Sequence, residues 1–446
     1  MYSKIGLRLI RISFLPSALL ATNSIRFNPK TKTFYTTQFS SRKLLLGSTL
    51  LICFAVFVFW RTIQIFLWRG GKSNPYFHIC YAFSFTFLIG SSSLIYLNVY
   101  QKSICQVQTQ MVRYCCQFEV FSFLIVCYIS CTANRLRKKC GVQETARKCK
   151  KYAPSSDKAE SSFLRLAFLA GQNTHLWMRN YDPRRSLTGA LLDGLLLSSI
   201  ISFSVIPLGS IFHYFVYPET PIYFTTVLPA MEDLDIYIQW SQAIFVIYYC
   251  YAFWQHSMII CILGFLYVFS ILPLLHCEFR VGAKNQKSSQ HLRSGRVLPF
   301  EYRCLEIMHK QFAGITGWLI NMLQTCLGQF ILFANVSLIM YRNMLEGHIK
   351  LLLLVWSIIV QIVWILFLEM AGRFHTHAKR TVSSWKQMKF RTPQEKAYMS
   401  KFRKSCRPLQ IGCEGMFIIK RLTVLKFMRA VIKGTFRAVL TLGKRK

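Results

Sequence analysis

Four basic residues near the end of the chain have a spacing that could support chemistry. Lys426, Arg429, Lys433 and Arg437 are separated by 3, 4 and 4 residues, which places them on one face of a helix. A helix that crosses a bilayer must turn such a face toward protein or water. An amphipathic helix with the same pattern can instead lie flat on anionic lipid. Both interpretations, a helix lining an aqueous pore and a surface anchor, stay open at this point.

Enzyme signatures are absent from the sequence. It contains no Gly-rich phosphate loop, no HExxH and no Cys/His metal spacing, so we predict no enzyme activity, no cofactor and no metal site. His375 and His377 lie in a basic segment and are expected to be solvated. Asp193 lies inside an apolar run, where a carboxylate is either functional or reaches back to the cytoplasmic end of the helix.

The composition indicates a membrane protein. Hydrophobic residues make up 53% of the 446 residues and charged residues 16%, against about 25% charged in soluble domains. A net charge of +38 is typical of nucleic-acid binding or of basic cytoplasmic loops. Because the charges lie between apolar segments of membrane-spanning length, we expect the lipid bilayer, and no nucleic acid, as the partner.

The apolar runs predict an all-α, polytopic fold with seven transmembrane helices, an inside N-terminus and an outside C-terminus. The run 236–277 is interpreted as one long helix that projects into the cytoplasm. The predicted helices are 44–66, 76–99, 187–215, 236–277, 312–340, 351–370 and 408–442.

The basic residues set the predicted topology. The first 43 residues carry eight Lys/Arg and no acidic residue, and 135–185 carries 13 Lys/Arg against four Asp/Glu, so both belong in the cytoplasm. An even number of crossings then separates them, and 119–133 becomes an interfacial helix. The loop after the third helix has Glu219, Glu232, Asp233 and Asp235 without Lys or Arg, and is expected outside. The 16 cysteines fall elsewhere and are expected to be reduced.

The predicted organisation follows from these boundaries. It comprises a cytoplasmic segment 1–43, helices one to four in 44–277 with a basic cytoplasmic loop at 100–186, a cytoplasmic loop 278–311, and helices five to seven in 312–446. The basic, acid-free start also resembles a mitochondrial presequence.

The C-terminal segment resembles the last helix of the insect-type chemoreceptors, the odorant and gustatory receptors, in the versions of springtails and related arthropods. The resemblance covers about 40 residues, and a Gln-Phe pair that ends the gustatory motif is missing. The matching residues are Ser405, Cys406, Arg407, Pro408, Leu409, Gly412, Gly415, Phe417, Leu425, Phe427, Gly434, Thr435 and Phe436.

The resemblance implies a chemosensory receptor subunit in the plasma membrane. It would be a ligand-gated cation channel, opened by a small odorant or tastant and built as a homo- or heterotetramer with the last helix along the pore. The gate would then comprise Val439, Leu440, Leu442 and Gly443, and the ligand pocket Phe77, Phe212, Tyr214, Tyr237 and Trp240. These aromatic residues are equally typical of an interfacial belt. The basic face departs from the pattern, because Lys and Arg rings disfavour cations.

Two other function classes have seven or more spans. A G-protein-coupled receptor has the opposite orientation from the one predicted here, and the sequence lacks both Asp-Arg-Tyr at the third span and outside cysteines for a disulfide. An organellar transporter would show internal repeats, and none is evident. Both remain alternatives to the receptor channel.

Overall fold

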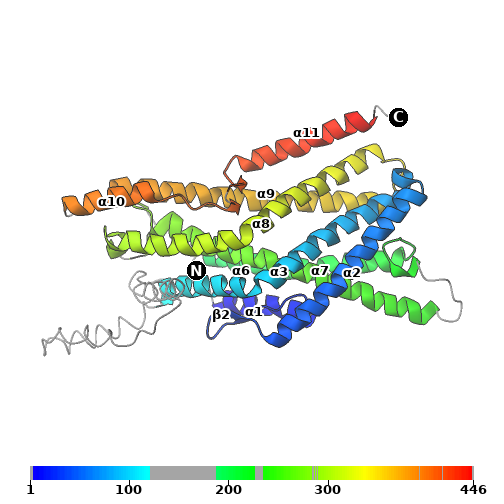
Figure 1. Ribbon diagram of the computed structural model, residues 1–446, viewed down its shortest axis with the longest axis horizontal. Coiled ribbons are helices and arrows are strands. Elements are labelled where there is room, and N and C mark those ends of the chain that lie inside the picture. Colours follow the sequence, from blue (N-terminus) through cyan, green and yellow to red (C-terminus); the bar gives the residue numbers. More distant parts are fainter. Residues whose placement is uncertain are drawn as a thin grey trace.

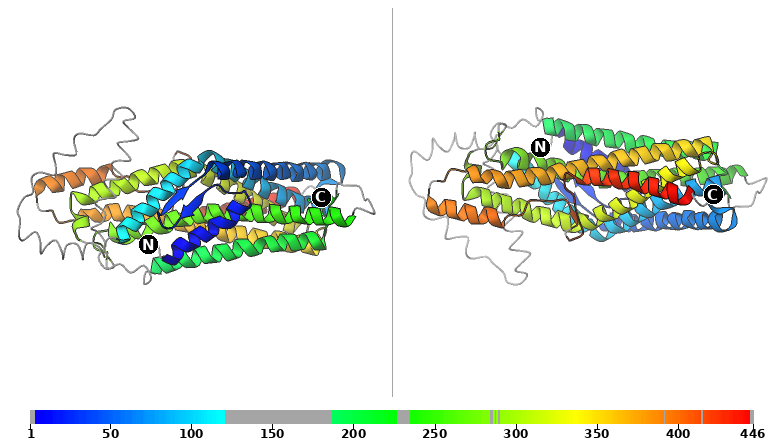
Figure 2. Two further views of the ribbon diagram at one scale, coloured as in Figure 1. Left: turned by 90° about the horizontal axis from the view of Figure 1, so that it is seen from below. Right: turned by 90° about the horizontal axis from the view of Figure 1, so that it is seen from above.

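The computed structural model of the chain is an elongated bundle whose long helices run along one axis (Figures 1 and 2). It describes residues 4–120, 187–226, 235–283, 286, 288, 290–390, 392–413 and 415–443. The elements are α1 Lys4–Leu19, β1 Arg26–Asn28, β2 Thr33–Tyr35, α2 Gln38–Trp68, η1 Gly71–Ser73, α3 Pro75–Val120, α6 Leu187–Val216, η5 Phe224–Thr226, α7 Asp235–Pro273, η6 Leu274–Glu278, η7 Gln290–Arg293, α8 Val297–Met340, α9 Gly347–Ser384, η8 Trp385–Gln387, α10 Pro393–Ser405, β3 Gly412–Cys413, β4 Phe417–Ile418 and α11 Thr423–Gly443.

Six described helices are long and apolar enough to cross a membrane: α2, α3, α6, α7, α8 and α9. They contain the first six predicted spans, and the run 236–277 forms a single helix, α7, that ends in the π-helical turn η6. α11 is not among the six, so the seventh crossing and the sides on which the two ends lie stay predictions.

Two predicted loops are partly helical. α3 continues past residue 99 to Val120, and α8 begins at Val297 inside the predicted loop 278–311. The charges in these segments favoured loops, but buried apolar residues recur at helical spacing, as at Leu298, Tyr302 and Leu305, so an amphipathic helix packs there. The predicted helix 119–133 and the part 121–186 of the basic loop lie outside the described residues.

The N-terminal segment folds onto the bundle. α1 packs against α6 and α7, and β1 pairs with β2 as a small antiparallel hairpin. Thr109 on α3 fastens this hairpin, since its Oγ1 accepts a hydrogen bond from Phe34 N (2.8 Å) and donates one to Phe34 O (3.2 Å). The chain then enters α2 through a capping box formed by Thr37 and Ser40, which satisfies two otherwise free N–H groups.

The predicted continuous helix 408–442 is wrong over its first 15 residues. The chain forms the β3–β4 hairpin there, and α11 begins only at Thr423. Gly412 and Gly415 have φ of 141° and 83°, which are conformations that glycine adopts readily and that interrupt a helix. A Cβ on Gly317 of α8 would lie 2.8 Å from the carbonyl oxygen of Gly412, so the hairpin rests directly on the backbone of α8.

This close approach gives a stability prediction. Gly317→Val should lower the thermal midpoint of the detergent-solubilised protein, because the added carbons overlap the β3 backbone. We expect the free energy of unfolding to fall by about 1–3 kcal/mol. Gly314→Val is the matched control on the same helix, since a Cβ there has no atom within 4 Å. Equal midpoints for the two variants would contradict the packing described.

Candidate functional site

A small aromatic pocket lies between α2, α3, α6 and α7, next to the loop that joins α6 to α7. Its volume is about 10 Å³, the space of about one water molecule. The residues that line it are Phe54, Phe83, Phe87, Ser210, Ile222, Tyr223, Val246, Tyr249 and Cys250. The lining side chains are mostly carbon, which suits a small apolar or aromatic molecule. The polar side-chain atoms are those of Ser210, Tyr223, Tyr249 and Cys250.

Ring contacts hold the pocket closed. Phe54 stacks on Tyr249 with ring centroids 4.2 Å apart and meets Phe87 edge-on at 4.8 Å. Phe83 and Phe87 are four residues apart, so α3 presents both on the same side. Offset and edge-on ring pairs attract one another beyond the area that they bury. A ligand larger than water therefore enters only if these rings move.

The loop after α6 closes this end of the pocket through a buried cation. Arg61 of α2 is 6% exposed, and its guanidinium donates to the carbonyl oxygen of Pro221 (3.3 Å) and to Thr226 Oγ1 (3.2 Å). The Tyr223 hydroxyl bonds His213 Nδ1 at 2.8 Å. Burial raises the pKa of Tyr223 well above its ordinary value, so the hydroxyl stays neutral. These bonds fix the loop over the aromatic rings.

The five predicted ligand residues divide into two groups. Phe77 and Tyr214 are buried, and Tyr214 meets Tyr223 of the pocket wall with ring centroids 4.8 Å apart. Phe212, Tyr237 and Trp240 are 69%, 80% and 64% exposed and point away from the pocket. The lining rings of α2, α3 and α7 were not predicted, although the spacing of Phe83 and Phe87 was a usable signal.

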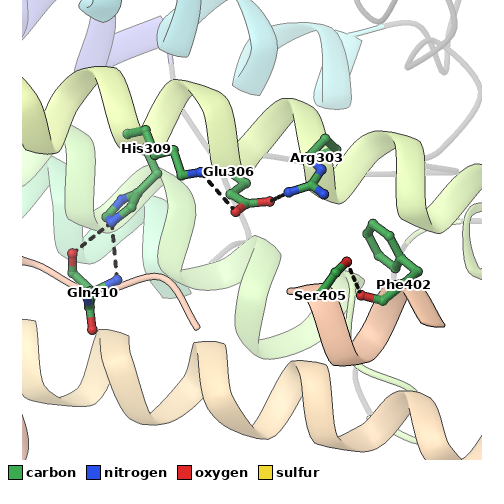
Figure 3. Close-up of polar contacts among 7 residues, drawn as sticks. Arg303, Glu306, His309, Phe402, Ser405 and Gln410 are labelled. Atoms are coloured by element: carbon green, nitrogen blue, oxygen red, sulfur yellow. Dashed lines mark hydrogen bonds and ion pairs between the residues drawn. The ribbon is translucent and has the colours of Figure 1, made fainter. Parts of the chain in front are cut away.

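A second polar cluster joins the segment before α11 to α8 (Figure 3). His309 Nε2 lies 2.9 Å from the carbonyl oxygen and 3.2 Å from the backbone nitrogen of Gln410. On its other side His309 Nδ1 bonds the Tyr267 hydroxyl of α7. One turn away Glu306, 5% exposed, pairs with Arg303 and Lys310 at 2.5 and 3.5 Å.

Ring stacking makes this cluster rigid. Tyr267 lies flat on Phe312 with ring centroids 3.5 Å apart, and Phe374 of α9 stacks on His309 at 5.4 Å. α7, α8 and α9 thus meet around one histidine that also holds the chain leading to α11.

The predicted gate and motif residues lie on α10, in the connection after it, in the β3–β4 hairpin and on α11. Cys406 is buried at the end of α10, Pro408 lies in the connection, and Gly415 lies in the turn between β3 and β4. On α11, Thr435, Val439 and Leu442 are half-buried, Phe436 and Leu440 are exposed, and Gly443 ends the helix.

Metal binding and the carboxylate of Asp193 were also considered in the sequence. Among the described residues no group of three or more His, Cys, Asp or Glu side chains is placed to hold a metal ion. Asp193 lies on α6 and is half-buried, and its role stays a prediction.

No protein-family model and no curated protein matches the sequence. Among solved structures, the insect olfactory receptor OR5 from Machilis hrabei matches with a TM-score of 0.56 at 10% identity, over 98% of this chain and 98% of that chain. The same receptor in complex with eugenol matches with a TM-score of 0.54 at 10% identity, over 98% and 99% of the two chains. The chain has the insect olfactory receptor fold. At this identity the likeness establishes the fold, which confirms at that level the resemblance found in the last 40 residues and extends it along the chain.

A reactivity prediction follows for the junction within this olfactory receptor fold. Burial, and secondarily the charge of Glu306, raises the pKa of the Cys406 thiol to about 12. At pH 8 only about one thiol in ten thousand is then the reactive thiolate. Cys406 should stay unmodified by iodoacetamide at pH 8 while half-buried Cys413 reacts, as read by peptide mass spectrometry. Unfolding in guanidinium should expose Cys406, and rapid modification of it in the folded protein would contradict its burial.

Proposed function

We propose that the chain is a chemosensory receptor subunit, a plasma-membrane ion channel that a small molecule opens. The observation that supports this proposal is the aromatic pocket between α2, α3, α6 and α7 in a chain with the olfactory receptor fold. One solved structure with this fold is an olfactory receptor in complex with eugenol, and we infer that an odorant-sized molecule is bound here too.

The proposal assigns a tetramer, with α11 of each subunit along the pore and the N-terminus in the cytoplasm. The gate is assigned to the outer part of α11, at Val439, Leu440, Leu442 and Gly443. The junction at His309 supports this assignment, because it connects the ligand-bearing helix α7 to the segment leading into α11. The family resemblance implies cations as the permeant ions, and the basic face of α11 is the point at which this chain departs from it.

Expression in cells without endogenous receptors tests the function directly. Currents evoked by a panel of volatile molecules that includes eugenol, with or without a second receptor subunit, are the expected result. An epitope tag at the N-terminus should bind antibody only after permeabilisation. A tag that is accessible on intact cells contradicts the topology, and surface protein that never yields a current contradicts the channel.

The pocket makes a residue-level prediction. Phe54→Ala should change the rank order or potency of the active molecules, because it removes the ring that contacts both Tyr249 and Phe87. Phe59→Ala on the same helix is the matched control, since Phe59 is 54% exposed on the outside of the bundle. Dose–response curves measure the potency of each molecule on both variants. Equal changes in potency for Phe54→Ala and Phe59→Ala would show that the pocket does not recognise the ligand.

A further inference from the structure

Two histidines from distant parts of the chain meet at the end of the bundle that carries the loop between α6 and α7 (Figure 1). His213 lies in the last turn of α6, and His348 lies in the first turn of α9. Their ring centroids are 5.6 Å apart, and the ring of Tyr217 stacks on His348 at 3.8 Å. The contact between the two imidazoles therefore joins the end of α6 to the start of α9.

Each imidazole has one nitrogen beside an oxygen and one nitrogen without a partner. His213 Nδ1 bonds the Tyr223 hydroxyl at 2.8 Å, and His348 Nδ1 lies 3.4 Å from the Glu346 carboxylate. The Nε2 atoms of both rings are buried and have no hydrogen-bond partner in the described part of the chain. His213 is 8% exposed and the His348 side chain 14%. Because buried polar atoms are normally paired, the two Nε2 atoms are positions at which a ligand is expected.

The same arrangement is found around metal-binding histidines. A histidine that ligates a metal through one nitrogen usually donates its other N–H to an oxygen, which fixes the tautomer and the orientation of the ring. Two imidazoles bound to one tetrahedral zinc ion at about 2.0–2.1 Å place their ring centroids on the order of 5 Å apart, close to the 5.6 Å of this pair. Two histidines are fewer than the three or four protein ligands of a resident zinc ion, so water completes the coordination and the ion exchanges with solution.

The charges around this pair favour a cation. The Glu219 carboxylate acts electrostatically on His213, and the Glu346 carboxylate lies beside His348. The loop 217–235 contains no Lys or Arg. A site lined by one sign of charge raises the local concentration of ions of the opposite sign, so these carboxylates attract a divalent cation toward the two imidazoles.

A second histidine pair has the opposite surroundings. His276 of η6 and His377 of α9 meet edge-on with ring centroids 4.5 Å apart. Arg280 and Arg380 act electrostatically on both rings, and their positive charges repel a metal cation. The pair His276 and His377 therefore provides matched control variants within the same chain.

We propose that His213 and His348 form a site for a divalent metal ion that prefers imidazole ligands, such as Zn²⁺ or Cu²⁺. The bound ion ties the end of α6 to the start of α9. Because His213 also bonds Tyr223 of the pocket wall, the ion should hold the loop closed over the aromatic pocket and weaken the response to small molecules. The metal site depends on the geometry of the two rings, whereas its effect on the response rests on the proposed function.

Thermal unfolding of the full-length protein in lipid nanodiscs tests the site, after accessible thiols have been blocked with N-ethylmaleimide. Zn²⁺ at about 100 µM should raise the thermal midpoint, because an ion that binds only the folded state stabilises it. Ca²⁺, which prefers oxygen ligands, should not raise it. The shift should be lost in His213→Gln and His348→Gln and kept in His276→Gln and His377→Gln. Equal shifts in all four variants, or no shift in the unaltered protein, overturn the metal site.

Copper-catalysed oxidation tests the same site without any substitution, so it also decides the case in which a variant fails to fold. Cu²⁺ binds imidazole more tightly than Zn²⁺ does, and in the presence of ascorbate it oxidises the side chains that hold it. Peptide mass spectrometry should find oxidised His213 and His348, with far less oxidation at His276 and His377. Oxidation that spares both His213 and His348 overturns the inference.

Currents measure the effect of the ion on the response. With eugenol and related volatiles as probes, Zn²⁺ in the bath should raise the half-maximal concentration of the active molecules by about fivefold or more. His348→Gln should abolish this shift, and His377→Gln should keep it. Zn²⁺ that raises the thermal midpoint but leaves the currents unchanged overturns the effect on the response. Absence of any current without metal counts against the proposed function, while unfolding and oxidation still decide the metal site.

Discussion

The structure depends on the contact between α8 and the segment that leads into α11. Gly317 lets the backbones of α8 and β3 meet without an intervening side chain, and Gly412 lets β3 approach Phe417 of β4. His309 then fixes the register of the two by bonding the backbone of Gln410. Because α7 and α9 converge on the same histidine through Tyr267 and Phe374, the position of α11 is set by the packing of three long helices.

The aromatic pocket contacts the middle of α7, and the junction lies near its C-terminal end. Tyr249 belongs to the pocket wall and Tyr267 to the junction, 18 residues further along the same helix, a separation of about 27 Å. In the proposed function, α7 connects the small-molecule site to the segment that leads into α11. The rings that fill the pocket also keep the helices together, so ligand entry and helix movement are expected to be coupled.

The sequence predicted the membrane helices well and their surroundings less well. Hydropathy located the six long spans, including α7 as one helix, because a bilayer requires a run of apolar residues whatever the tertiary contacts. The charged residues predicted a loop where α8 begins. In the structure Arg303 and Lys310 pair with Glu306 on the surface of this helix. The β3–β4 hairpin was missed because it depends on contact with Gly317, which lies 95 residues earlier in the chain.

The pocket residues were harder to predict for a different reason. A membrane helix has aromatic residues on all sides, and only packing decides which of them turn inward. Phe212 and Tyr214 are two residues apart, yet one is 69% and the other 3% exposed. The five predicted residues lie on α3, α6 and α7, three of the four helices around this pocket, whereas the contribution of α2 and the individual rings required coordinates.

The folded N-terminal segment has a consequence for how much of this chain can be removed. Ile10, Phe14, Phe27 and Phe34 are all at most 5% exposed, and the Tyr248 hydroxyl of α7 donates to the carbonyl oxygen of Leu20. Removal of the first 35 residues would expose apolar side chains on the flank of the bundle and would remove the contacts of α1 with α6 and α7. The N-terminal segment is thus part of the packed core of the bundle.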